Sequence, residues 1–113
     1  ALHEEAALQR EQASLALMIQ VYRAFDQVNT AQEELALARD MQAVAEAQVA
    51  QARQQHAQGF LLPSELLQHI SQLEEAQLQV LQADFYHQTS IALLHNVTGK
   101  TKTDFEDTPH DRI

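Results

Sequence analysis

The first 58 residues contain neither glycine nor proline, the two residues that most often end a helix. Apolar residues in this stretch recur in alternating steps of four and three, which is a 3.5-residue repeat typical of helices packed in a left-handed supercoil. The repeat predicts one helix from about residue 2 to 58. Its members are Leu17, Val21, Ala24, Val28, Ala31, Leu35, Ala38, Ala45, Val49 and Ala52, with Gln42 as the one interruption.

A second apolar stripe accompanies this series. It comprises Leu15, Met18, Tyr22 and Phe25, and later Met41 and Val44. A two-stranded coil buries one seam per helix, so a second stripe predicts neighbours on two sides and association of the chain.

The first break in the helical pattern is Gly59, which predicts a helix end in the left-handed conformation. Phe60, Leu61 and Leu62 follow as an apolar tip, and Pro63 suits the first turn of a second helix. That return helix is predicted from about residue 63 to 98, with Gly99 as its end. The expected fold is therefore all-α: a long antiparallel helical hairpin over residues 1–99 with the first helix longer, followed by an irregular tail over 100–113.

Charge and composition exclude several classes of function. The formal net charge is −9, from 16 acidic and 7 basic residues, so the chain lacks the positive surface that nucleic-acid binding needs. No cysteine is present, which excludes disulfides and thiolate metal sites. No apolar run reaches about 18 residues, so no membrane-spanning helix is predicted.

Residues with catalytic or metal-binding chemistry are present without the spacing that such chemistry needs. His56 and His69 flank the tip, and His87 and His95 lie on the return helix, but zinc needs three or four converging ligands. The paired acids Glu33–Glu34 and Glu74–Glu75 have no cleft that would separate their pKa values. We therefore expect no enzyme activity, no cofactor and no metal site.

The segment from Ala36 to Gly59, the tip and the return helix resemble the TolC-like family of outer-membrane efflux proteins. The residues that carry the resemblance are the tip Gly59, Glu65 six positions later, the pair Leu66–Leu67, and then Leu73, Ala76, Leu78, Ala83, Tyr86, Leu94 and Gly99, with Tyr22, Ala24, Ala31, Leu35, Leu37 and Ala38 upstream. The chain departs from the family pattern at His56, Leu62, Gln68 and His69, which affects the detailed chemistry of the tip.

The resemblance implies a periplasmic segment of an outer-membrane channel for efflux or type I secretion. In that family three protomers continue a membrane β-barrel as an α-helical barrel. The tip meets a periplasmic adaptor protein and, through it, an inner-membrane pump. The resemblance assigns Gly59, Phe60, Leu61 and Leu62 to adaptor docking and Glu65 to the acidic pore entrance. It does not distinguish between the two repeats of a protomer.

Two other interpretations of the hairpin stay open at this point. One is a structural coiled-coil hairpin, such as the hairpin of an adaptor protein or of a scaffold. The other is a hairpin that binds metal through its histidines. The double apolar stripe favours the wall of a tube over a simple coil.

Overall fold

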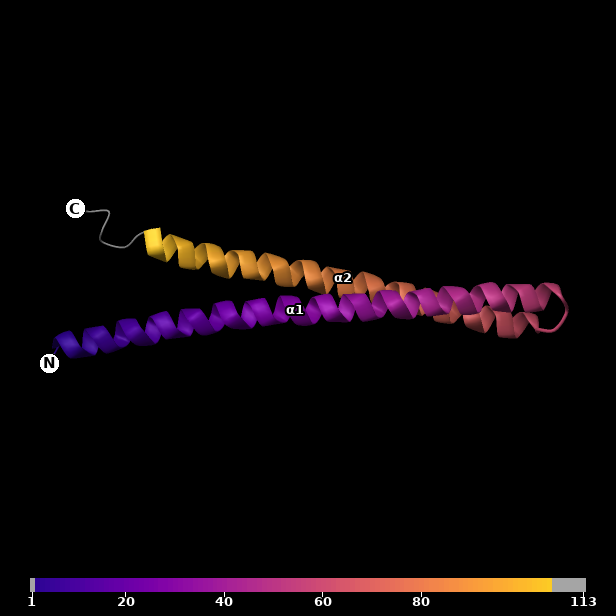
Figure 1. The fold of residues 1–113 in the computed structure, drawn as a ribbon, viewed down its shortest axis with the longest axis horizontal. Helices are drawn as coiled ribbons and strands as arrows, with labels where there is room; N and C mark the ends of the chain where they lie inside the picture. The colour runs from indigo at the N-terminus through magenta and orange to yellow at the C-terminus, as the bar shows by residue number, and fades with distance from the viewer. Residues whose placement is uncertain (1, 107–113) are drawn as a thin grey trace. The chain divides into compact units, whose positions relative to one another are not determined.

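The computed structural model describes residues 2–106, and it describes side-chain environments through Gly99. It contains two helices: α1 spans Leu2–Ala57 and α2 spans Pro63–Glu106 (Figure 1). No strand occurs within residues 2–106, so the all-α prediction is confirmed for this part of the chain. The helices divide between two compact units. The terminal unit combines Ala1–Thr30 with Gln88–Ile113, and the tip unit is Ala31–His87.

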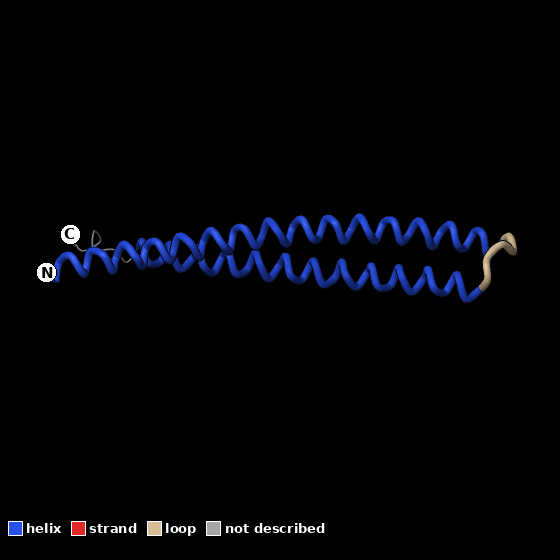
Figure 2. Tube along the Cα trace, turned by 90° about the horizontal axis from the view of Figure 1, so that it is seen from below, coloured by secondary structure: helices blue, strands red, loops and turns tan. Residues whose placement is uncertain are grey.

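Within the tip unit, α1 and α2 run side by side in opposite directions from the turn (Figure 2). The tip unit is thus an antiparallel helical hairpin, as the sequence predicts. The predicted continuation of this hairpin into an α-helical barrel concerns other chains and remains a prediction.

The buried residues of α1 form one seam with a 3.5-residue repeat, and this confirms the predicted series. Gln42 does not interrupt the seam, because it is half-buried at its expected position and its Nε2 donates a hydrogen bond of 3.0 Å to Glu46 Oε1. The buried or half-buried residues of this seam are Leu17, Val21, Ala24, Val28, Ala31, Leu35, Ala38, Gln42, Ala45, Val49, Ala52 and His56. Position in the repeat, rather than hydropathy, decides which residues face the partner helix.

The seam of α2 follows the same repeat. It consists of Leu66, His69, Leu73, Ala76, Val80, Ala83, His87, Ser90, Leu94 and Val97, all buried or half-buried. In α1 an alanine stands at every seventh position from Ala24 to Ala52. Small side chains at the contact let helix axes approach closely, because the distance between packed helices depends on the residues between them.

The predicted end of the return helix at Gly99 is wrong, and so is the irregular tail over residues 100–106. α2 continues through Gly99 to Glu106, which gives helices of 56 and 44 residues. Gly59 is the glycine with a positive φ, whereas Gly99 keeps helical geometry. After Gly59 a proline follows within four residues and prevents the helix from continuing, but after Gly99 the next proline is Pro109. The remainder of the predicted tail lies outside the described residues.

Candidate docking tip and side groove

The turn between the helices is a Schellman motif. α1 ends at Ala57, and Gly59 takes the left-handed conformation with φ of 82°. The Gly59 amide donates to the carbonyl oxygen of His56 at 3.0 Å, and the Phe60 amide donates to that of Gln55 at 2.9 Å. These are the two hydrogen bonds that define the motif. The predicted role of Gly59 as the helix-ending residue is confirmed.

The start of α2 is equally well defined. The carbonyl oxygen of Leu62 accepts hydrogen bonds from the amides of Glu65 and Leu66, both at 3.1 Å, so Leu62 is the N-cap residue. Pro63 is then the first helical residue, where its missing N–H costs no hydrogen bond. A rigid backbone on both sides therefore holds the three residues of the apolar tip.

The side chains of this tip point mostly into solvent. Phe60 is 80% exposed and Leu62 is 62% exposed, while Leu61 is half-buried. In many Schellman motifs the residue after the glycine makes an apolar contact with the last turn of the helix. Here that turn offers Gln54 and Gln55 instead, and Phe60 stays exposed. The structure brings the four predicted docking residues together in one turn.

The predicted pore-entrance residue, Glu65, is exposed in the first turn of α2. A carboxylate at this position is stabilised by the partial positive charge of the helix N-terminus. Glu65 therefore stands beside the apolar tip as an exposed negative charge.

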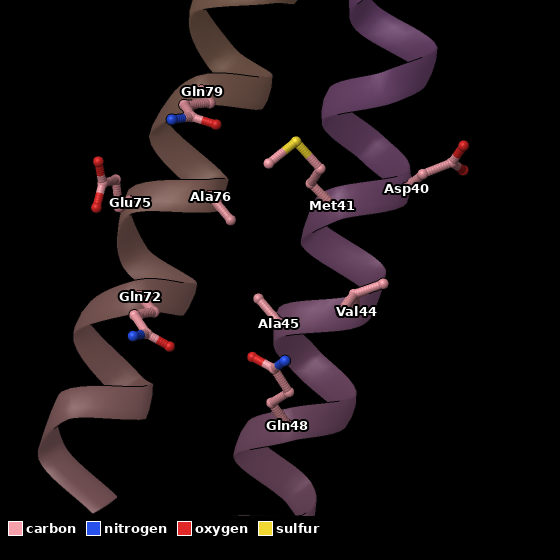
Figure 3. Close-up of a pocket in the computed structure, with 9 residues that line it drawn as sticks. All are labelled: Asp40, Met41, Val44, Ala45, Gln48, Gln72, Glu75, Ala76 and Gln79. Carbon is pink, nitrogen blue, oxygen red and sulfur yellow. The ribbon is translucent and has the colours of Figure 1, made fainter. Parts of the chain in front are cut away.

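A groove on one side of the tip unit was not predicted. It has a volume of about 450 Å³, and its apolar floor comes from both helices (Figure 3). Figure 3 shows Met41, Ala45 and Ala76 between the two helices, with the carboxylates of Asp40 and Glu75 turned toward the outer edges. The other lining residues are Val44, Gln48, Gln72 and Gln79. Met41 and Val44 stand out in the sequence as apolar, but the contribution of α2 is visible only once the helices are paired.

The second apolar stripe of α1 is exposed, as predicted, but it is two patches rather than one. Tyr22 and Phe25 each directly follow a seam residue, whereas Met41 and Val44 each directly precede one. Successive residues differ by about 100° around a helix, so these two pairs lie on different flanks of the seam. The first patch, with Leu15, Met18, Tyr22 and Phe25, belongs to the terminal unit, and the second belongs to the groove of the tip unit.

The histidines near the tip are interfacial. His56 and His69 are both half-buried at seam positions, and the Nδ1 atom of His69 is buried without a hydrogen-bond partner. Within the described residues, no three His, Cys, Asp or Glu side chains come together in a group that would hold a metal ion. The acid pairs Glu33–Glu34 and Glu74–Glu75 are exposed.

The described parts of α1 and α2 contain no stretch that is both long and apolar enough to cross a membrane. Comparisons of the chain with protein families, with curated proteins and with solved structures found no match.

Proposed function

We propose that the chain is the periplasmic helical hairpin of a trimeric outer-membrane channel for efflux or type I secretion, and that its tip docks a periplasmic adaptor protein. The observation that carries the proposal is the turn itself. It is a rigid, doubly hydrogen-bonded tip that presents Phe60 and Leu62 to solvent.

An exposed aromatic and an exposed leucine on a rigid turn suit a docking contact. Large apolar side chains at the centre of an interface supply much of its binding energy, and a backbone that is already ordered loses little entropy on binding. The hairpin does not need Phe60 for its own packing, because this side chain is 80% exposed. The side chain is therefore available to a partner.

The sides of the hairpin suit the wall of a tube. Apolar residues outside the seam, such as Leu37, Met41 and Val44, are 61%, 51% and 58% exposed, so neighbouring helices would bury them. In this proposal Glu65 adds negative charge at the tip, where it narrows the pore entrance and makes the entrance prefer cations over anions. The partners are then the adaptor at the tip, the inner-membrane pump behind it, and further protomers along the sides.

Disulfide trapping in the whole protein, expressed in a cell with its adaptor and pump, tests the docking assignment. The sequence has no cysteine, so a Phe60→Cys substitution introduces a single thiol into this segment. Partner cysteines are placed one at a time along the hairpin tip of the adaptor. Gln51→Cys, which is exposed on the side of α1, is the matched control.

We expect cross-links from position 60 that depend on the position of the adaptor cysteine, and none from position 51. Equal cross-linking from both positions, or none from position 60 while the protein is abundant in the outer membrane, would overturn the docking assignment. The hairpin would then be a structural coiled-coil module, such as an adaptor hairpin or a scaffold.

A further inference from the structure

The three residues of the apolar tip differ in exposure. Phe60 is 80% exposed and Leu62 is 62% exposed, whereas Leu61, which stands between them, is half-buried. All three side chains are large and apolar, so hydropathy does not account for the difference. The turn therefore buries its middle side chain and exposes the one on either side.

Hydrogen bonds fix the backbone of the turn before and after Leu61, but not at Leu61 itself. The amide of Phe60 is bonded to the last turn of α1, and the carbonyl oxygen of Leu62 is bonded to the first turn of α2. Within the described residues, neither the amide nor the carbonyl oxygen of Leu61 takes part in a hydrogen bond. Packing of its side chain is the interaction left to hold Leu61 in place.

The nearest part of the hairpin core is the end of the seam. The seam residues closest to the turn are His56 in α1 and Leu66 in α2, both half-buried and both five residues from Leu61 along the chain. In a Schellman motif the apolar contact with the helix often comes from the residue after the glycine, but here that residue is the exposed Phe60. Leu61 is the tip side chain whose burial fits this contact.

We propose that Leu61 is a positioning residue, which caps the end of the seam against His56 and Leu66 and so fixes the direction in which Phe60 and Leu62 point. This role separates Leu61 from the docking residues, to which the resemblance assigns it. A tip that is already ordered loses less entropy when a partner binds, so Leu61 strengthens docking through its neighbours. The role in docking rests on the proposed function, whereas the capping contact belongs to the chain alone.

A double-mutant cycle tests whether Leu61 packs on the end of the seam. Leu61→Ala and Leu66→Ala should each lower the equilibrium constant of folding by about tenfold, measured by urea unfolding of the whole chain at one protein concentration. If the two side chains touch, the double variant should lose less than the product of the single losses, by about threefold. Leu61→Ala with Val80→Ala is the control pair, because Val80 is a half-buried seam residue far from the turn. Those two losses should multiply.

Hydrogen exchange of the turn amides tests positioning, because a merely global loss of stability affects amides throughout the hairpin. The amides of Gly59 and Phe60 donate the two hydrogen bonds of the turn, at 3.0 and 2.9 Å. In Leu61→Ala both should exchange about tenfold faster relative to amides in the middle of α2, because the turn opens locally. Val80→Ala should leave this ratio unchanged. Leu61→Met, which keeps an apolar side chain of similar volume, should restore both the ratio and the stability.

Cross-linking in the whole protein tests the link to docking. With Phe60→Cys as the reporter, the presence of Leu61 should confine the cross-links to a narrow range of adaptor positions. Leu61→Ala should spread them over a wider range without abolishing them, because the reporter then points in several directions. Leu61→Met and Val80→Ala should both keep the range narrow.

Any of three results would overturn the positioning role. The first is a pair of losses at Leu61 and Leu66 that multiply fully, the second is an unchanged exchange ratio in Leu61→Ala, and the third is an unchanged range of cross-links. A lack of cross-links from position 60 in every variant would instead refute docking at the tip, and with it the part that Leu61 plays there. The capping contact would then stand or fall on the cycle and the exchange ratio.

Discussion

Gly59 and Gly99 are the two glycines of the chain, and replacing each with alanine should change stability in opposite directions. Gly59 has φ of 82°, a conformation in which an L-residue costs roughly 1–2 kcal/mol. A Cβ at this position would meet no atom within 4 Å, so the cost is conformational rather than steric. Alanine also restricts the conformations of the unfolded chain, and this offsets about 0.4–1 kcal/mol of the cost. The net loss for Gly59→Ala is therefore about 1 kcal/mol.

Gly99 lies within α2, and a Cβ there also meets no atom within 4 Å. Glycine in a helix interior is about 0.8–1 kcal/mol less favourable than alanine, so Gly99→Ala should stabilise by about that amount. The two variants thus differ by about 2 kcal/mol, although the chemical change is identical. Because the glycines lie far apart, the double variant should unfold close to wild type.

Urea unfolding followed by far-UV circular dichroism, at one protein concentration for all variants, measures these differences. Gly59→Asn is a useful intermediate, since asparagine tolerates the left-handed conformation better than alanine. It should fall between wild type and Gly59→Ala. If Gly59→Ala were as stable as wild type, the turn would not depend on its left-handed residue. If Gly99→Ala were destabilising, α2 would end at Gly99 after all.

Three further predictions concern the seam and the tip. Ala38→Leu should destabilise the chain by about 1–3 kcal/mol in thermal unfolding, because Ala38 is buried in the seam. Ala43→Leu, at an exposed position of α1 outside the seam, should change stability by about 0.5 kcal/mol or less. His69→Leu should raise the free energy of unfolding by about 1 kcal/mol, since it removes a buried nitrogen without a partner. A loss of stability would mean that His69 has a partner in solution. Phe60→Ser with Leu62→Ser should alter stability by about 0.5 kcal/mol or less and abolish the adaptor cross-links, and unchanged cross-linking would show that the apolar tip is not the docking surface.

The seam and the turn could be predicted from sequence because both depend on local patterns. A 3.5-residue repeat determines which face of a helix is buried, and Gly59 followed by Pro63 determines where the chain reverses. Gln42 is the exception, because a polar side chain occupies a position that the repeat places in the seam. A half-buried glutamine is tolerated there because its amide hydrogen-bonds Glu46 in the next turn.

The end of α2 and the groove were harder to predict, for different reasons. A glycine is compatible with either a helix end or a helix interior, and the residues after Gly99 contain no signal that forces a reversal. The groove depends on which residues of α1 and α2 stand opposite each other. That pairing is set by the length of the turn, and it cannot be deduced from the repeat of either helix alone.

The small size of the seam residues leads to one last prediction, on how stability depends on protein concentration. Of the seven buried apolar residues of the described chain, five are alanines, the other two being Leu35 and Val49. Alanine buries little apolar area, so this seam supplies less stabilisation than a seam of leucines would. Met41 and Val44, in contrast, are more than half exposed.

If further protomers cover these exposed side chains, as the proposed function requires, folding and association are coupled, and the midpoint of thermal unfolding should rise with protein concentration. Met41→Gln with Val44→Gln should reduce that rise while leaving the seam intact, because both side chains lie outside the seam and are exposed. A wild-type midpoint that stays constant from micromolar to near-millimolar concentration would show that the alanine-rich seam is sufficient by itself. Because Met41 and Val44 lie outside the seam, a concentration dependence of the midpoint that requires them reports contacts between copies.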